Sequence, residues 1–270
     1  MDILIRKNYE EMSKTAADII AQQIRSNPKS VLGLATGSTP IGTYKELVLQ
    51  HREENLDFSK ILSFNLDEYL GISIDLEKPY EEDQSYARFM WEELFKHINI
   101  KKGNYNVPNG LTENPHQFCE KYEDMVKKAG GIDLQLLGIG GDGHVGFNEP
   151  GTSFASKTHV AALTKQTLDD NYDLFYKKSG IPRHEMPHFA ITMGIGTILN
   201  SRHALLIANG ERKADIIAKM IEGPLTSQIT STCLQMHPKV TVVLDKAAAA
   251  SLKRVEHYKH VENLRNKYSL

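Results

Sequence analysis

Short apolar runs rich in β-branched residues alternate along the chain with longer segments whose apolar residues recur at helical spacing. The short runs predict strands at residues 3–5, 31–35, 61–65, 134–139, 189–193, 204–207 and 240–244. The longer segments predict helices near residues 9–26, 40–51, 84–97, 115–129, 211–222 and 246–262. Strands and helices in this order are typical of α/β proteins built on a buried, mostly parallel sheet.

The predicted architecture is one doubly wound, mostly parallel sheet in a Rossmann-like, three-layer αβα arrangement with helices on both faces. No Pro/Gly/Ser-rich linker and no internal repeat divides the 270 residues, so the sequence predicts a single domain over residues 1–270. Open sheets of this class bind ligands at the carboxyl ends of their strands. The residues that follow each predicted strand are therefore the candidates for function.

The charge balance and the cysteines narrow the classes of partner. The 32 basic and 34 acidic residues give a net charge of -2, so no broad field attracts nucleic acid or an anionic membrane, and neither partner is expected. Cys119 and Cys233 lie in no CxxC or Cys/His metal spacing, which argues against a disulfide framework or a zinc site. With no apolar run near the roughly 20 residues of a membrane span and no leader pattern, we expect a cytoplasmic protein.

A small, hydroxyl-rich loop follows the second predicted strand. Thr36, Gly37, Ser38 and Thr39 precede Pro40 at the start of a predicted helix. Free backbone N–H groups and the positive dipole end favour an anion there, and Gly37 allows the backbone to approach a phosphate. The loop lacks the GK[ST] ending of a Walker A motif. From this segment alone, a phosphate site and an ordinary turn with Thr39 as helix N-cap are equally good interpretations.

Two adjacent acids, Asp67 and Glu68, follow the third predicted strand. Neighbouring residues at a strand end point in different directions, so one carboxylate can face a cleft while the other faces the surrounding structure. A carboxylate whose pKa is raised by burial can take a proton from carbon. Without further context, a solvated acidic loop is the more common explanation of such a pair.

The glycine-rich segment 138–151 carries Asp142, His144 and Glu149. It formally contains a G-x-G-x-x-G pattern from Gly138, but the crossover helix and following βα unit of a dinucleotide site are missing, so we reject that interpretation. Histidine titrates near neutrality, and a carboxylate on its second ring nitrogen would fix its tautomer. One histidine without a second nitrogen or sulfur donor makes a poor metal site, so the segment predicts a proton-transfer site.

Four motifs occur in order along the chain: GLATGSTPIGTY, FNLDEYLG, GIGGDGHVGFNEPGTSF and CLQMHPKVTVV. In sequence and separation they resemble the glucosamine-6-phosphate deaminase (isomerase) family over nearly the whole chain. The wider superfamily includes 6-phosphogluconolactonases, but DEY together with GFNEP looks like the deaminase branch. The resemblance implies isomerisation and deamination of glucosamine 6-phosphate to fructose 6-phosphate and ammonia in amino-sugar catabolism, without a metal or organic cofactor.

The resemblance also assigns roles to residues. Asp67 is implied to take the C2 proton of the sugar and to help deliver it to C1 through an enolamine, while His144 opens the pyranose ring. Asp142 and Glu149 would orient and polarise that histidine. The loop at 36–39 would hold the phosphate together with Lys213. From the residues alone, Lys213 is either a solvated helix lysine or an anion ligand, and its place after a strand and a glycine favours the second.

One residue expected from the resemblance is missing. The family carries an arginine that closes on the phosphate within a pattern like TR-x-x-N-x-R, and Asp173 stands here in its place. An anion in place of a bidentate cation should weaken phosphate binding unless another cation substitutes. The segment that follows contains Lys177, Lys178 and Arg183, so we expect a lid at about residues 163–187 in which Arg183 or a lysine supplies that cation.

Alternatives stay open at this stage. One is a deaminase or isomerase for another sugar phosphate, such as galactosamine 6-phosphate, and another is a sensor that binds a sugar phosphate without turnover. A lactonase of the same superfamily would not need Asp67 as a carbon base. The amphipathic C-terminal segment packs either on the core or on a second subunit, which leaves a homo-oligomer open.

Overall fold

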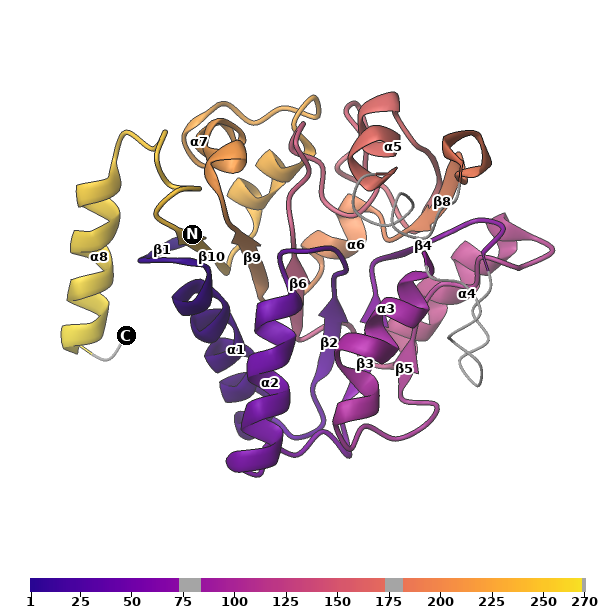
Figure 1. Ribbon diagram of the computed structural model, residues 1–270, viewed down its shortest axis with the longest axis horizontal. Coiled ribbons are helices and arrows are strands. Elements are labelled where there is room, and N and C mark those ends of the chain that lie inside the picture. Colours follow the sequence, from indigo (N-terminus) through magenta and orange to yellow (C-terminus); the bar gives the residue numbers. More distant parts are fainter. Residues whose placement is uncertain (73–83, 173–181, 269–270) are drawn as a thin grey trace.

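The computed structural model describes residues 1–72, 84–172 and 182–268, and a seven-stranded sheet runs through its centre (Figure 1). The strand order is β1-β10-β9-β6-β2-β3-β5, and neighbouring strands are parallel. β2, β6, β9 and β10 are buried at every position, which explains their mostly apolar sequences; Gln135 in β6 and Thr241 and Asp245 in β10 are polar. The predicted parallel α/β architecture is confirmed. The strands are β1 (Asp2–Arg6), β2 (Val31–Leu34), β3 (Leu62–Asn65), β5 (Tyr105–Asn106), β6 (Leu134–Leu137), β9 (Ala204–Ala208) and β10 (Val240–Asp245).

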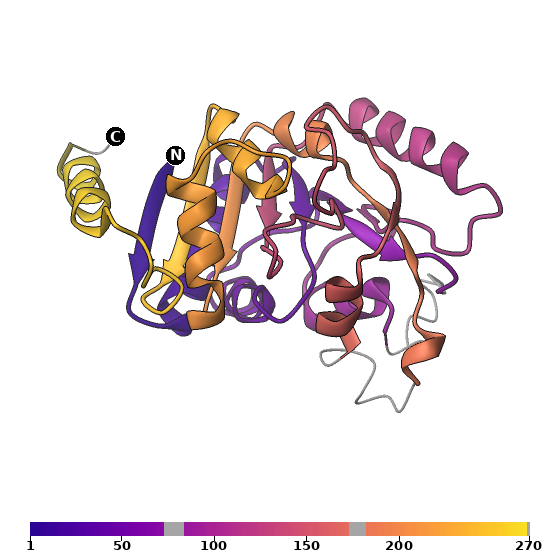
Figure 2. The same ribbon diagram turned by 90° about the horizontal axis from the view of Figure 1, so that it is seen from above.

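Helices cover both faces of this sheet. α1, α2 and α3 follow one another in front of the strands in Figure 1, with α1 touching α2 and α2 touching α3. The view from above places α4 on the opposite side (Figure 2). Within the described ranges, no helix is long and apolar enough to span a bilayer. The helices of these layers are α1 (Tyr9–Ser26), α2 (Ile41–Glu53), α3 (Tyr86–Glu93), α4 (Pro115–Lys128), α6 (Ile195–Leu199) and α7 (Ala214–Glu222).

A second, antiparallel sheet of three strands lies beside the first, in the order β4-β8-β7. Its strands are β4 (Asp67–Tyr69), β7 (His159–Ala162) and β8 (Phe189–Thr192). β8 confirms the strand predicted at 189–193, but it pairs in this sheet and not in the parallel one. The hydrophobic pattern does not predict β4, because Leu66 alone separates it from β3. The fold therefore contains a sheet that the sequence analysis did not foresee.

Several predicted boundaries also differ. The strand predicted at 134–139 ends at Leu137, and the helix predicted at 84–97 is divided into α3 and the 3-10 turn Phe95–His97. The helix predicted at 246–262 is wrong in its first half, since residues 246–251 form turns. There the Asp245 carboxylate accepts the N–H of Ala248 at 2.7 Å, and Ala248 packs into the core.

The last helix is α8 (Val255–Tyr268), which stands at one end of the molecule beside β1 (Figures 1 and 2). Glu262 of α8 accepts a hydrogen bond from Arg6 of β1 at 2.8 Å, and Arg265 pairs with Asp2. α8 therefore shields the edge strand of the parallel sheet, whose exposed backbone groups would otherwise invite pairing with another chain.

The acid stability of this fold should depend on His203, a buried residue just before β9 whose Nε2 lies 2.9 Å from Thr241 Oγ1. Burial, with the charges of Lys239 and His237, lowers the pKa of His203 from 6.5 to about 4. The folded state then binds fewer protons than the unfolded state between these values, so stability is full above about pH 6.5 and is lost as the pH falls toward 4. Because of His203, we expect the free energy of unfolding to fall by about 2 kcal/mol when the pH is lowered from about 7.5 to about 5.

Urea unfolding of His203→Gln at these two pH values should show a smaller loss than wild type. His260→Gln, at an exposed position of α8, is the matched control and should behave like wild type. Equal acid sensitivity of wild type and His203→Gln would contradict the prediction.

Candidate active site

A cleft of about 170 Å3 opens at the carboxyl ends of β2, β3 and β6. The loops after these strands meet there, as expected for an open parallel sheet. α5 (Lys165–Asn171), which follows β7, contributes a further part of the wall. Of the residues predicted from sequence, the cleft is lined by Thr36, Gly37, Ser38, Thr39, Asp67, His144 and Lys213.

The loop at 36–39 turns sharply into α2. Gly37 has a φ of 104°, a conformation that residues with a side chain rarely adopt. The interpretation of Thr39 as a helix N-cap is wrong, because Pro40 holds that position and no side chain caps the helix. Thr39 Oγ1 instead donates to Asn209 Oδ1 at 2.9 Å, which ties this loop to the residues that follow β9. The loop is thus held in place from a neighbouring strand end while it lines the cleft.

Both acids after β3 are buried: 5% of Asp67 and 0% of Glu68 is exposed, so the solvated-loop interpretation is wrong. Asp67 lines the cleft, and Glu68 turns toward the start of α3. There Glu68 accepts from Ser85 Oγ at 2.9 Å and from the N–H groups of Tyr86 and Ala87 at 3.1 and 3.0 Å. A fourth hydrogen bond comes from the N–H of the next residue at 2.9 Å.

The different environments of Asp67 and Glu68 affect their pKa values differently. Burial and, to a lesser degree, the neighbouring Glu68 carboxylate raise the pKa of Asp67 to about 8. Burial also raises the pKa of Glu68 to about 7, against four hydrogen bonds that favour its ionised form. A carboxyl group that titrates near neutrality inside a cleft is suited to take up a proton and return it.

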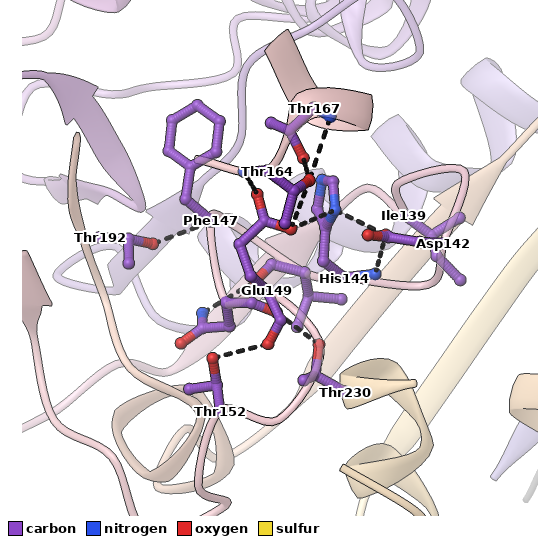
Figure 3. Close-up of polar contacts among 12 residues, drawn as sticks. Ile139, Asp142, His144, Phe147, Glu149, Thr152, Thr164, Thr167, Thr192 and Thr230 are labelled. Atoms are coloured by element: carbon purple, nitrogen blue, oxygen red, sulfur yellow. Dashed lines mark hydrogen bonds and ion pairs between the residues drawn. The ribbon is translucent and has the colours of Figure 1, made fainter. Parts of the chain in front are cut away.

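Asp142 and Glu149 converge on His144 (Figure 3). Of these three predicted residues, His144 lines the cleft, and the two acids are not among its lining residues. His144 Nδ1 lies 2.7 Å from Asp142 Oδ1 and 3.9 Å from Glu149 Oε2. Burial alone would raise the pKa of Asp142, but its hydrogen bond and charge interaction with His144 outweigh burial and lower that pKa. Because His144 Nδ1 lies beside the Asp142 carboxylate, Nε2 is the ring nitrogen available in the cleft.

Two glycines allow this arrangement. A Cβ atom on Gly140 would lie 2.3 Å from the His144 ring, so only glycine lets the ring rest against the backbone. Gly143 has a φ of 91° and turns the chain immediately before the histidine. The glycines of this loop therefore serve the histidine, in agreement with our rejection of a dinucleotide motif.

The three side chains of this cluster also have ligand atoms within 4.8 Å of one another. The 2.7 Å between His144 Nδ1 and Asp142 Oδ1 is a hydrogen-bond distance. Two ligands at about 2.1 Å from one ion would lie about 3 Å apart or more. A proton fits between these two atoms better than an ion, and the expected independence from metal stays a prediction.

Lys213 reaches the cleft from the 3-10 turn Glu211–Lys213 before α7, and its Nζ donates to Ile139 O at 2.7 Å. Burial lowers the pKa of Lys213, while the carboxylates of Asp170 and Asp142 oppose this shift. Among the described residues, no other lysine or arginine lines the cleft. Lys213 is therefore the cation best placed for a phosphate.

Residues 6–243 match the family described as glucosamine-6-phosphate isomerases/6-phosphogluconolactonase. The chain belongs to this family. A glucosamine-6-phosphate deaminase of Thermoanaerobacter pseudethanolicus is 48% identical over 262 residues, which are 97% of this chain and 99% of the relative. A glucosamine-6-phosphate deaminase of Clostridium novyi is 48% identical over 252 residues, 93% of this chain and 100% of the relative.

Solved structures of the glucosamine-6-phosphate isomerase/6-phosphogluconolactonase family agree with this fold. A monomeric glucosamine-6-phosphate deaminase matches with a TM-score of 0.86 at 42% identity, covering 93% of this chain and 100% of that chain. A 6-phosphogluconolactonase from Trypanosoma cruzi matches with a TM-score of 0.70 at 21% identity, covering 93% and 97%. The second likeness concerns the fold alone, because one fold hosts different reactions and the activity must be argued from the site.

Sequence reasoning missed three cleft residues on α5: Thr167, Asp170 and Asn171. The T and N of the family pattern TR-x-x-N-x-R fall on Thr167 and Asn171, a signal that could have identified both. Asn171 Nδ2 is buried without a hydrogen-bond partner among the described residues, so it is a free donor beside the cleft. Asp170 falls on an unspecified position of that pattern and brings a carboxylate close enough to affect the pKa of Lys213.

Arg183, the predicted substitute for the missing arginine, does not line the cleft. Its guanidinium pairs with Asp169 and lies over the Tyr172 ring, 5.4 Å from the ring centroid. Asp173 and the lysines that follow it fall outside the described residues, as does the middle of the lid predicted at 163–187. Replacement of the missing cation by Arg183 or a lysine therefore stays a prediction.

The carboxylate of Asp170 should weaken the binding of a phosphate at Lys213. We expect Asp170→Asn to lower the dissociation constant of inorganic phosphate roughly three- to tenfold, because one nearby negative charge is removed from a partly buried anion site. Isothermal titration calorimetry measures this constant directly. Asp124→Asn, on the exposed face of α4, changes the net charge equally and is the control. Unchanged or weaker phosphate binding by Asp170→Asn would contradict the prediction.

Proposed function

We propose that this protein is a glucosamine-6-phosphate deaminase that converts glucosamine 6-phosphate and water to fructose 6-phosphate and ammonia. The observation that carries the proposal is the presence of two separate proton-transfer groups, Asp67 and His144, in one cleft with an anion loop and Lys213. The relatives at 48% identity that are named glucosamine-6-phosphate deaminase support it. A lactonase would have no use for a buried carboxylate as carbon base.

Ring opening is the task of His144. Nδ1 lies against the Asp142 carboxylate, so Nε2 accepts the proton of the anomeric hydroxyl and passes it to the ring oxygen as the C1–O bond of the ring breaks. Glu149 and Asp142 stabilise the imidazolium that forms between these two transfers. The product of this step is the open-chain aldehyde.

Asp67 carries out the proton transfers at carbon. Its carboxylate takes the proton from C2, the electron pair forms the C1–C2 double bond, and the aldehyde oxygen takes a proton from the substrate ammonium, which gives an enolamine. Return of the proton to C1 leaves an iminium group at C2, to which water adds as ammonia departs. C2 is oxidised and C1 is reduced within the same molecule, so no external oxidant or organic cofactor is needed.

The phosphate of the sugar binds at the loops that follow β2 and β9. The N–H groups and hydroxyls of the loop at 36–39 and the ammonium of Lys213 are its ligands, with Asn171 Nδ2 as a further free donor. The described cleft offers one lysine faced by Asp170, so its cationic character is weak. Another amino-sugar phosphate, such as galactosamine 6-phosphate, carries the same phosphate group and is the second candidate substrate. Ammonia release from both sugars, compared at equal concentration, decides between them.

Three further properties belong to this proposal. A cytoplasmic enzyme fits the composition and the two buried free cysteines, Cys119 and Cys233. A single domain over residues 1–270 fits the shared core beneath the parallel sheet. A homo-oligomer remains a prediction, and a solved relative at 42% identity is described as monomeric.

Asp67→Asn should abolish the reaction while leaving the fold intact. Loss of the carbon base should lower kcat for ammonia release at least about a hundredfold, and incorporation of solvent deuterium at C1 of fructose 6-phosphate should fall with it. In wild type, kcat/KM should rise with pH up to about 8, because Asp67 must be ionised to accept the proton.

The melting temperature of Asp67→Asn should stay or rise, because a pKa raised above the unfolded value means that the buried charge destabilises the folded state as the pH increases from about 4 to 8. Glu46→Gln, on the surface of α2, is the control for loss of a carboxylate. Full activity of Asp67→Asn would refute the assigned role, and wild type that binds the sugar phosphate tightly without releasing ammonia would favour the sensor.

Metal removal should have no effect. Because the proton between His144 and Asp142 takes the place that an ion would need, dialysis against EDTA should leave kcat within about twofold of its initial value. Added Zn²⁺ or Mn²⁺ should not raise it. A loss of activity that is restored by one of these ions would show that the Asp142, His144 and Glu149 cluster is a metal centre.

A further inference from the structure

Glu149 is held from outside its own loop. Its Oε1 accepts from the N–H of Thr164 at 3.1 Å, and its Oε2 lies 3.2 Å from Thr164 Oγ1 (Figure 3). A carboxylate can only accept, so the hydroxyl of Thr164 donates to it. Thr164, which lies in another segment, therefore holds both carboxylate oxygens of Glu149.

Thr164 is also the N-cap of α5. Its Oγ1 accepts from the N–H of Thr167 at 3.3 Å, and the Thr167 hydroxyl lies 3.1 Å away. α5 supplies Thr167, Asp170 and Asn171 to the cleft wall. One hydroxyl thus connects the wall that faces the substrate with the carboxylate behind the histidine.

We propose that Thr164 is a positioning residue for His144, acting through Glu149; this inference rests on the proposed deaminase activity. The hydroxyl of Thr164 keeps Glu149 Oε2 3.9 Å from His144 Nδ1, beyond hydrogen-bond distance. Nδ1 then has Asp142, at 2.7 Å, as its one close carboxylate partner, and the ring keeps one orientation. Glu149 remains close enough to stabilise the imidazolium during ring opening.

Without this hydroxyl, Glu149 Oε2 loses its donor inside a buried site. His144 Nδ1, 3.9 Å from this oxygen, is a donor that the freed carboxylate can reach, so Glu149 turns toward it and competes with Asp142 for the same nitrogen. The ring then has two orientations, and its Nε2 no longer points reliably at the sugar oxygens. Ring opening slows, whereas proton transfer at carbon by Asp67 does not involve this contact.

Thr164→Val keeps the shape of the side chain and removes the donor. We expect kcat for ammonia release from glucosamine 6-phosphate to fall about tenfold with KM changed less than about threefold, as for other residues that orient a functional histidine through a second group. Thr164→Ser should restore kcat to within about twofold of wild type. Exchange of solvent deuterium into C1 of added fructose 6-phosphate in the presence of ammonium passes through the iminium and enolamine without opening the amino-sugar ring. Followed by NMR, this exchange should stay within about threefold of wild type.

Three comparisons separate this role from support of α5. Thr152→Val is the matched control, because Thr152 Oγ1 donates to the backbone carbonyl of Glu149 at 2.7 Å and not to its carboxylate; it should keep kcat. Thr164→Gly retains most of the helix cap but has no hydroxyl, so it should lose activity like Thr164→Val. In a Glu149→Gln background, Thr164→Val should cause little further loss, because both substitutions break the same contact.

Several results would overturn the inference: an unchanged kcat in both Thr164→Val and Thr164→Gly, an equal loss in Thr152→Val, losses that multiply in the double variant, or a parallel loss of C1 exchange. A wild-type protein that releases no ammonia would instead refute the proposed function. Melting temperatures of all variants identify any that fail to fold. If Thr164→Val fails to fold, kcat is compared among Thr164→Gly, Thr164→Ser and wild type.

Discussion

The distance between the two proton-transfer groups depends on the register of the small antiparallel sheet. Thr192 of β8 pairs with Asp67 on one side and with His159 on the other. Its hydroxyl also accepts from the N–H of Phe147, three residues after His144, at 3.0 Å. One threonine therefore fixes the loop that carries the carbon base and the loop that carries the histidine. A slip of one residue in β4 would turn Asp67 away from the cleft and bring a neighbour in its place.

Asp67 and Glu68 can both be buried because Glu68 has four hydrogen-bond donors, whereas Asp67 lines the cleft. Glu68 lies at the N-terminus of α3 with four hydrogen-bond donors, which favour its ionised form and oppose the rise of its pKa on burial. Its charge and the low polarity around Asp67 then raise the pKa of Asp67 into the range where a proton is taken and returned. The buried environment of Asp67 disfavours its ionised form. The ionised carboxylate therefore destabilises the fold, but it is also a stronger base than an exposed carboxylate. The helix that stabilises one acid thus tunes the other.

The parallel sheet and the loops at its carboxyl edge could be predicted because buried β-branched runs and helical spacing are local signals. The small sheet could not, since β4 has three residues next to β3, and its pairing with β8 joins positions more than a hundred residues apart. His144 could be proposed for proton transfer from its residue type and its neighbouring acids and glycines. Asp67 was proposed through the family resemblance, because two adjacent acids are more commonly a solvated loop. Thr164 and Asp170 were not proposed, because an N-cap threonine and a helix aspartate are common in any helix and acquire a role here only through the position of α5.

α5 connects the two ends of the cleft. It carries Asp170 and Asn171 toward the phosphate side, and its first residues share the Thr164 hydroxyl with Glu149 behind His144. In the proposed reaction, the phosphate lies near Asn171 and Asp170 on this helix of seven residues, whose N-cap Thr164 contacts Glu149. Binding of the phosphate would then help to fix the orientation of the imidazole, so sugars without a phosphate should be both bound and opened less well.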